Sequence, residues 1–465
     1  MLFSSPAFFV FFAAYLCCHA IVPARYRVAL IIGGSTFFYA WWKVEYTWLP
    51  FALMATAYGG VRWMEQASEP GSRRRRATLA IVALFLPLLV FKYTNFVYRD
   101  VLGPLFGWQG NLLDLGLPLG VSFVTFTLTA FVVDIYKGKY PSVPAGSTTL
   151  AYVLFFPHLI AGPILRPIEL VPQLEHPQLR TVRRLSVPLA IFTFGLVKKL
   201  VFADPIAEAV DGIYAQAGGA LSTPAALLAI YGFSVQIYCD FSGYTDMAIG
   251  LALMLGVRLP NNFLRPYGAV SIVDFWRRWH ITLSFWLRDY LYIPLGGSRD
   301  GAARQARNTV ITMVLGGLWH GANWTFVVWG LLHGLGVAAA HAVNRMAGGV
   351  RTLPRWLGVV LTFHFVTVLW VFFRAPNVGR ALEVLSAVVS GGGWGGAATL
   401  AQLNLFVVGL IAVFAVSHRF DDHRRVRAMV RYLRPEVLWP TLIFLWVTAI
   451  TVSQGSSAKF IYFDF

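Results

Sequence analysis

The chain has 465 residues, of which 57% are hydrophobic and 13% are charged, and its mean hydropathy is +0.63. Soluble domains carry about 25% charged residues, so this composition excludes a soluble globular protein and indicates an all-α polytopic membrane protein. In a soluble protein, the net charge of +17 would suggest binding to nucleic acid. Here most of the excess is typical of the cytoplasmic loops of a membrane protein, and the rest is available to hold an anionic ligand.

The N-terminal 22 residues form the first expected membrane span. They contain no Lys or Arg, whereas Arg25 and Arg27 follow them. A secretory signal carries its positive charges before the apolar run, so we expect this segment to be retained. Because a helical span needs about 20 residues, we expect about eleven full transmembrane helices, with shorter segments tilting or entering without crossing. The further apolar segments lie near 28–42, 47–61, 77–98, 117–136, 148–165, 186–203, 222–239, 243–257, 308–342, 356–373, 398–417 and 437–454.

Basic runs set the expected orientation. The sequence RRRR at 73–76, the stretch 258–307 and residues 418–434 are rich in arginine, so the positive-inside rule places them in the cytoplasm. The sequence has no repeat of fixed period and no long flexible linker, which predicts a single membrane domain over 1–465. We expect it in the lipid of a bacterial inner (cytoplasmic) membrane. Its predicted parts are N-terminal spans in 1–116, a core at about 117–342 and C-terminal spans in 356–465.

The stretch DFWRRWHITLSFWLRDYLYIPLGGSR, residues 274–299, has the pattern of an amphipathic helix. At 100° per residue, one side of this helix is polar and the opposite side carries Trp, Leu and Tyr. Two interpretations remain open. The helix lies at the interface with its Trp residues at headgroup depth, or it dips into the protein and turns its polar stripe toward a water-filled cavity. The polar stripe consists of Asp274, Arg277, His280, Ser284 and Arg288.

The run GGLWHGANWTFVVWG at 316–330 places His320 in an uncharged stretch. If Arg304 and Arg307 mark the cytoplasmic end of this segment, a rise of 1.5 Å per residue puts His320 roughly 18–20 Å into the bilayer. An ionisable group at that depth is costly unless it faces a cavity or a partner, which favours a functional residue over a core histidine. Asn323, at i+3, would share its helix face and hold the imidazole in one tautomer.

Other motifs of enzyme chemistry are missing from the sequence. His333 lies about 140° around the helix from His320, so a pair of histidine metal ligands is unsupported. No HExxH, Walker A, GxSxG or CxxC motif occurs. We therefore expect no metal site and no bound cofactor.

Two long stretches carry a family resemblance. WRRWHITLSFWLRDYLYIPLGGSR (276–299), followed by LGGLWHGANWTFVVWGLLHG (315–334), resembles the membrane-bound O-acyltransferase family, and closely its bacterial branch typified by the alginate O-acetyltransferase membrane subunit. The likeness extends to PLGVSFVTFTLTAFVVDIYKG (118–138), FFPHLIAGPILRP (155–167), YCDFSGYTDMAIGLALMLG (238–256) and the ending FIYFDF. TLTAFVVD at 127–134 departs from the expected polar or aromatic beginning.

The resemblance implies both a fold and a site. The fold would be a ring of tilted and re-entrant helices around a central pore, with funnels from both faces. In the family the intramembrane histidine, here His320, is catalytic, and a second histidine or asparagine upstream corresponds to His280. The expected substrate contacts are Asn323, Trp319, Arg277, Ser284, Arg288 and Asp289.

The implied activity is O-acetyl transfer across the membrane. The protein would take an acetyl group from a cytoplasmic donor, with acetyl-CoA as the expected acyl donor, for O-acetylation of an exopolysaccharide such as alginate. Neutral His320, with an ordinary pKa of about 6.5, would take the proton of the attacking hydroxyl. Arg277 and Arg288 would bind the anionic donor or merely anchor the helix. A periplasmic acetyltransferase of the serine-esterase-like type would complete the transfer.

Two alternatives stay open. Peptidoglycan acetylation or D-alanyl transfer to teichoic acid would use the same histidine with another donor or acceptor. A proton-coupled transporter also has many spans and an intramembrane histidine. However, the sequence shows neither a second carboxylate relay near His320 nor inverted repeats, which disfavours a transporter.

Overall fold

The structure is a computed structural model that describes residues 1–114, 116–140, 142–175, 184–215, 221–348, 353–390, 404–453 and 460–461. Within these ranges the chain is helical and contains no β-strand, which confirms the all-α class. Six helical segments of the described ranges are long and apolar enough to cross a membrane: Pro70–Tyr93, Ser186–Ala215, Thr223–Met254, Trp324–Met346, Arg355–Arg374 and Pro435–Ser453. Shorter apolar helices cover Pro6–Ile21, Val121–Tyr136 and Leu405–Phe420. The protein is therefore a multi-pass membrane protein, while the total of eleven spans and the ring stay predictions.

The chain divides into two compact units. The first combines Met1–Phe192 with Met247–Pro260, and the second combines Thr193–Asp246 with Asn261–Phe465. The helices of the first unit are α1 (Pro6–Ile21), α2 (Arg27–Ala40), α3 (Trp48–Glu65), α4 (Pro70–Leu88), α5 (Gly103–Phe106), α6 (Val121–Tyr136), α7 (Gly146–Leu154), α8 (Phe156–Leu159), α9 (Pro167–Glu175) and most of α10 (Ser186–Val197). Two π-helical turns, η3 (Leu89–Tyr93) and η4 (Phe96–Leu102), extend α4.

Aromatic packing and a few buried hydrogen bonds hold the first unit together. Phe156 of α8 packs against Phe38 of α2, with 5.3 Å between ring centroids. The Phe156 N–H donates to the Ser35 hydroxyl at 3.2 Å, and the Tyr39 hydroxyl donates to Leu119 O at 2.9 Å. The predicted apolar segment 148–165 thus contains short helices, α7 and α8, and neither is long enough to cross a bilayer.

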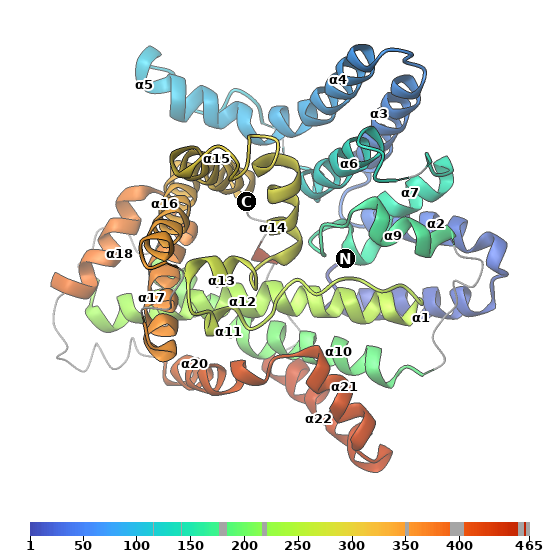
Figure 1. The fold of residues 1–465 in the computed structure, drawn as a ribbon. Helices are drawn as coiled ribbons and strands as arrows, with labels where there is room; N and C mark the ends of the chain where they lie inside the picture. Colours follow the sequence, from blue (N-terminus) through green and yellow to red (C-terminus); the bar gives the residue numbers. More distant parts are fainter. Residues whose placement is uncertain are drawn as a thin grey trace. The chain divides into compact units, whose positions relative to one another are not determined.

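The second unit contains the long helices that carry the candidate site (Figure 1). Its helices are α11 (Asp204–Ala215), α12 (Thr223–Met254, whose last turns belong to the first unit), α13 (Ile272–Trp276), α14 (Ile281–Leu287), α15 (Ala302–His320), α16 (Trp324–Met346), α17 (Arg355–Arg374), α18 (Val378–Ser390), α20 (Leu405–Ser417), α21 (His423–Tyr432) and α22 (Pro435–Ser453). Short turns are the π-helical η5 (Lys198–Ala203) and η7 (Arg288–Tyr292) and the 3₁₀ turns η6 (Pro266–Gly268) and η8 (His418–Phe420).

Two predicted segments, 222–239 and 243–257, are in fact one helix of 32 residues, α12. The polar residues between them do not interrupt it, because they are satisfied inside the protein. Most of its apolar window is buried, so α12 is a core helix rather than a helix that faces lipid.

Glycines allow α15 and α16 to pack closely as an antiparallel pair. A Cβ atom at Gly317 would collide with the backbone of Phe326, and one at Gly330 would collide with the backbone of Met313. At Gly334 it would approach the Val310 Cα to 2.9 Å. The segment 308–342 is therefore a helical hairpin, and its bend lies directly after His320.

Adjacent lysines on η5 bind four buried or half-buried carboxylates. Lys198 Nζ lies 2.6 Å from Asp246 and 2.7 Å from Asp421. Lys199 Nζ lies 2.7 Å from Asp204 and 2.8 Å from Asp240. The ion pairs of both lysines connect the core helix α12 to η5. Lys198 also connects η5 to Asp421, just before α21.

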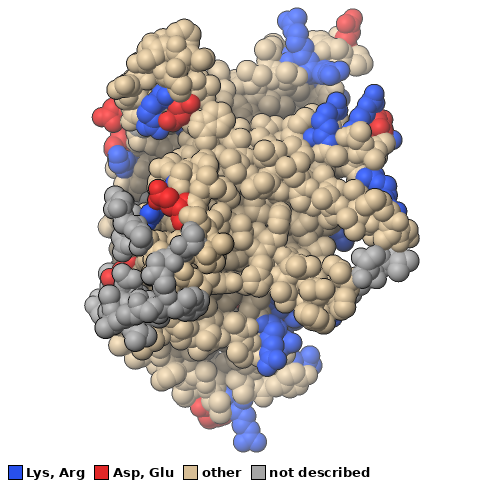
Figure 2. All heavy atoms as spheres, turned by 90° about the vertical axis from the view of Figure 1, so that its left-hand side faces the viewer, with Lys and Arg blue, Asp and Glu red and all other residues tan. Residues whose placement is uncertain are grey.

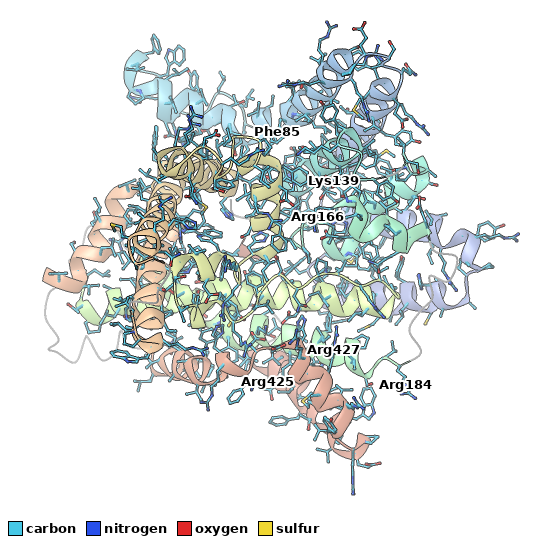
Figure 3. The ribbon with its side chains drawn as sticks, viewed as in Figure 1. Phe85, Lys139, Arg166, Arg184, Arg425 and Arg427 are labelled. Carbon is cyan, nitrogen blue, oxygen red and sulfur yellow. The ribbon has the colours of Figure 1, made fainter. Side chains whose placement is uncertain are left out.

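Helix α21 is basic and exposed, with Arg424, Arg425, Arg427 and Arg431 at its surface; Arg425 and Arg427 are labelled in Figure 3. The face of the molecule in Figure 2 has a wide area without basic or acidic side chains. Both features are typical of a membrane protein, in which lipid tails meet uncharged surface and arginine lies near headgroups.

Candidate functional site

His280 lies in a turn between α13 and α14, where its backbone is left-handed with φ 41° and ψ 56°. The predicted continuous helix over 274–299 is therefore wrong. The physical reason is a clamp from a segment distant in sequence, because the Ile281 N–H donates to Asn262 O at 3.0 Å. That bond takes an amide that a continuous helix would have paired within itself.

The first residue of the predicted polar stripe, Asp274, stabilises the local backbone and a neighbouring arginine. Asp274 accepts hydrogen bonds from Arg278 Nε at 2.9 Å and from the Val270 N–H at 3.1 Å. Arg277 is exposed. Because the turn at His280 separates α13 from α14, neither Asp274 nor Arg277 shares a continuous helix face with the rest of the stripe.

His280, Ser284 and Arg288 remain in line, since they follow one another every four residues through α14 and into η7. The Ser284 N–H donates to His280 O at 3.0 Å, and the Ser284 hydroxyl donates to Trp279 O at 3.3 Å. At a rise of 1.5 Å per residue, the three residues span about 12 Å. The line runs from the exposed Arg288 to the fully buried His280.

A cavity of about 320 Å³ lies beside this line, and Ser284 and Arg288 contribute to its wall. Asp289, the other predicted contact in η7, pairs with Arg288 at 2.7 Å. Further polar groups of the cavity wall were not predicted, because they lie within or just before the apolar segment 308–342, where hydropathy gives no reason to select them. Those groups belong to Gln305, Thr309, Thr312 and His341, and Trp276 and Met313 also line the cavity.

His320 is the last residue of α15, and its side chain is buried among aromatic rings. The ring centroids of Trp319, Trp329 and Phe373 lie 4.9, 5.3 and 5.2 Å from that of its imidazole. The next residue, Gly321, leaves room for this packing, since a Cβ atom there would overlap the Phe326 ring.

Asn323 does not share a helix face with His320, which corrects the predicted role of this residue in holding the imidazole. The first helix ends at His320, and Asn323 caps the second one, α16. Its Oδ1 accepts from the Thr325 N–H at 3.0 Å, and its Nδ2 donates to Pro376 O at 2.9 Å. An i+3 relation holds only within one continuous helix, and the bend at Gly321 removes it.

The structure brings three of the predicted residues together around one indole. His280 lies 6.2 Å and His320 lies 4.9 Å from the Trp319 ring, measured between centroids. On its other side, His320 contacts Trp329, whose ring lies 5.8 Å from that of Trp276 in the cavity wall. Aromatic side chains therefore connect the cavity to His320.

His333 is buried against the same aromatic group, at 4.6 Å from Trp329 and 5.1 Å from Trp276. Within the described residues, neither of its ring nitrogens has a hydrogen-bond partner. The sequence placed it away from His320 on the helix and so gave no reason to select it. Among all the residues that the structure describes, no three His, Cys, Asp or Glu side chains are grouped so that they could hold a metal ion.

Comparison with known proteins adds an independent observation. Residues 141–377 match the family model described as MBOAT, membrane-bound O-acyltransferase family. The chain is 41% identical to a probable alginate O-acetylase of Azotobacter vinelandii over 87% of this chain and 80% of that protein. It is 36% identical to a peptidoglycan O-acetyltransferase of Helicobacter pylori over 84% and 80%, and 28% identical to a teichoic acid D-alanyltransferase of Bacillus subtilis over 62% and 74%.

Proposed function

The chain belongs to the membrane-bound O-acyltransferase family, and from this premise we propose that it takes acetyl from cytoplasmic acetyl-CoA and passes it across the membrane for O-acetylation of an exopolysaccharide such as alginate. Family membership makes the protein an O-acyltransferase. The transporter alternative therefore has no support.

The observation that carries the proposal is the position of His320, buried at a helix bend and connected through Trp329 and Trp276 to a cavity. In the proposed step the acceptor hydroxyl attacks the thioester carbonyl, and its proton passes to His320 as the new C–O bond forms. The C–S bond then breaks, and the imidazolium returns the proton to the departing thiolate. The aromatic rings around His320 keep bulk water away from the thioester.

The cavity beside Ser284 and Arg288 is the proposed donor site. Acetyl-CoA carries phosphates that cannot enter the hydrocarbon layer, whereas its acetyl group is small and neutral. The exposed Arg288 in the cavity wall suits the phosphates, and Trp276 in the same wall leads through Trp329 to the buried His320. Ser284 and Thr312 supply hydroxyl groups to the cavity wall, and Asp289 orients the Arg288 guanidinium through their ion pair. The exposed Arg277 is proposed as a further contact to the phosphates.

Replacing Arg288 with alanine is expected to raise the KM for acetyl-CoA by about tenfold, because a charge-assisted contact to phosphate is lost. The value of kcat should change little, since Arg288 is proposed to bind the phosphates of the donor and takes no part in the proton transfer at His320. Steady-state kinetics of the purified enzyme measures both. Arg304→Ala is the matched control, because Arg304 pairs with Asp300 at an exposed position outside the cavity wall. Equal effects of both variants would show that Arg288 only anchors its helix.

The relatives of this chain differ in the molecule that accepts the acyl group. Relatives of this chain are named for alginate acetylation, peptidoglycan acetylation and D-alanylation of teichoic acid. We favour an exopolysaccharide because the alginate O-acetylases are about 40% identical over most of the chain. The proposed location is the bacterial inner membrane, with a periplasmic acetyltransferase of the serine-esterase-like type as partner.

Reconstitution in liposomes tests the proposal as a whole. With acetyl-CoA on the side of residues 418–434 and alginate on the opposite side, we expect polymer acetylation only when the periplasmic acetyltransferase is also present. The protein alone should bind acetyl-CoA and hydrolyse it slowly. Robust acetylation of the polymer by this chain alone would refute the need for a partner, and no use of acetyl-CoA in any arrangement would refute the donor.

A further inference from the structure

Asn262 is almost completely buried, and its side-chain oxygen receives three hydrogen bonds. The Thr282 N–H lies 3.1 Å from Asn262 Oδ1, the Thr282 hydroxyl lies 3.0 Å from it, and His280 Nδ1 lies 3.2 Å from it. A backbone N–H can only donate, so the amide must present its oxygen to this group. A ring nitrogen that faces the same oxygen must then carry a proton.

His280 is neutral and therefore has only one N–H. It lies outside the six candidate spans, and burial lowers its pKa to about 3. With the proton on Nδ1, its Nε2 carries a lone pair and acts as a hydrogen-bond acceptor. Asn262 thus determines which ring nitrogen is available.

The backbone of His280 is held in a costly conformation. Left-handed backbone is unfavourable for a residue other than glycine, and such residues persist where the surrounding structure requires them. Here the Asn262 carbonyl accepts from the Ile281 N–H, so the same residue fixes both the backbone and the ring of His280. This double attachment orients the imidazole far more strictly than packing alone.

His280 Nε2 is buried, and in the described part of the chain it has no hydrogen-bond partner. The imidazole is surrounded by the rings of Phe241, Trp319 and Phe263, whose centroids lie 4.7, 6.2 and 6.5 Å from its own. A buried acceptor without a partner destabilises the protein, so a substrate group that donates a hydrogen bond to it binds more tightly. Ser284, one helical turn from His280, lines the cavity of the proposed donor site, so the acyl donor is the substrate that lies nearest to this nitrogen.

We propose that Asn262 is a positioning residue that fixes His280 as its Nδ1–H tautomer, so that Nε2 accepts a hydrogen bond from an amide N–H in the arm that carries the thioester. This inference rests on the proposed acyl donor. Acetyl-CoA has such an amide, separated from the thioester sulfur by two carbons. An amide held at His280 places the acetyl group past Trp319, on the side of His320.

Two short donors test this contact. S-acetyl-N-acetylcysteamine has the amide N–H, and its N-methyl derivative does not. The wild-type protein should cleave the first with a kcat/KM about tenfold higher, since one buried hydrogen bond is lost with the second. In Asn262→Leu this preference should fall to about one, whereas Asn262→Asp, which keeps an acceptor oxygen, should retain it. Thr282→Val is the control, because it removes only one of the three bonds to Asn262 and should also retain the preference.

A measurement independent of turnover covers variants of low activity. In ¹⁵N spectra of histidine-labelled protein, His280 should be protonated at Nδ1 in the wild type and at both positions in part in Asn262→Leu. A single Nδ1–H form in that folded variant would overturn the positioning role. If the wild type uses acetyl-CoA but shows no preference between the short donors, the amide contact is wrong and the proposed function stands. If it uses no thioester, both are wrong.

Discussion

Acetyl transfer is expected to fall by about 10²- to 10⁴-fold when His320 is replaced with alanine, because the attacking hydroxyl loses the group that takes its proton. The side chain is buried at a helix bend among Trp319, Trp329 and Phe373, where water can replace it only poorly. Transfer of labelled acetyl from acetyl-CoA to alginate, measured in liposomes with the periplasmic acetyltransferase present, gives the rate.

His364→Ala is the matched control for this experiment. His364 is an exposed residue of α17, its ring Nδ1 lies 2.8 Å from the backbone carbonyl of Val360 in its own helix, and its ring packs against Tyr231. It should transfer acetyl at the wild-type rate. The amount of folded protein in the membrane and its thermal unfolding midpoint should match for both variants. Near-normal transfer by His320→Ala would remove His320 from the reaction.

Replacing Lys198 with methionine is expected to lower the free energy of unfolding by about 3–5 kcal/mol. Lys198 is the cation between Asp246 and Asp421, and the Tyr238 hydroxyl donates to Asp421 at 2.6 Å. Without the ammonium group, two carboxylates of low exposure would face each other with only His423 to offset them. Lys198→Arg keeps the charge and should recover part of the loss. Unfolding by denaturant in detergent measures the difference.

An exposed ion pair serves as the comparison. Arg304 and Asp300 lie 3.1 Å apart with about half or more of each side chain exposed. Such pairs contribute little to stability, so Arg304→Met should leave the unfolding curve nearly unchanged. A similar small change for Lys198→Met would mean that water reaches the buried pair and screens it.

The sequence predicted the class of the fold but placed several boundaries wrongly. Hydropathy reports how apolar a segment is, and this was enough to predict a helical membrane protein. It does not report whether polar residues inside a segment find partners. For this reason α12 was divided in two, although Asp240 and Asp246 are paired with lysines from a segment more than forty residues earlier.

The sequence predicted which residues belong to the candidate site better than it predicted how they are arranged. The polar spacing selected His280, Ser284 and Arg288, which do lie in one line. The break at His280 could not be predicted, since it depends on Asn262, eighteen residues earlier in the chain. The bend after His320 did have a signal, because a glycine followed by an asparagine two residues later marks a helix end and a new N-cap. Counting Asn323 along a single helix overlooked it.

The paired lysines of η5 also bear on how the protein works. They hold α12 at Asp240 and Asp246, six residues apart, which is about 9 Å along the helix axis. A carrier that exposes its site to each side in turn must rock or slide its helices, and a shift of one helical turn would break both attachments. We therefore expect α12 to keep its position relative to η5 during turnover, so that Phe241 holds its contact with the His280 ring throughout the reaction.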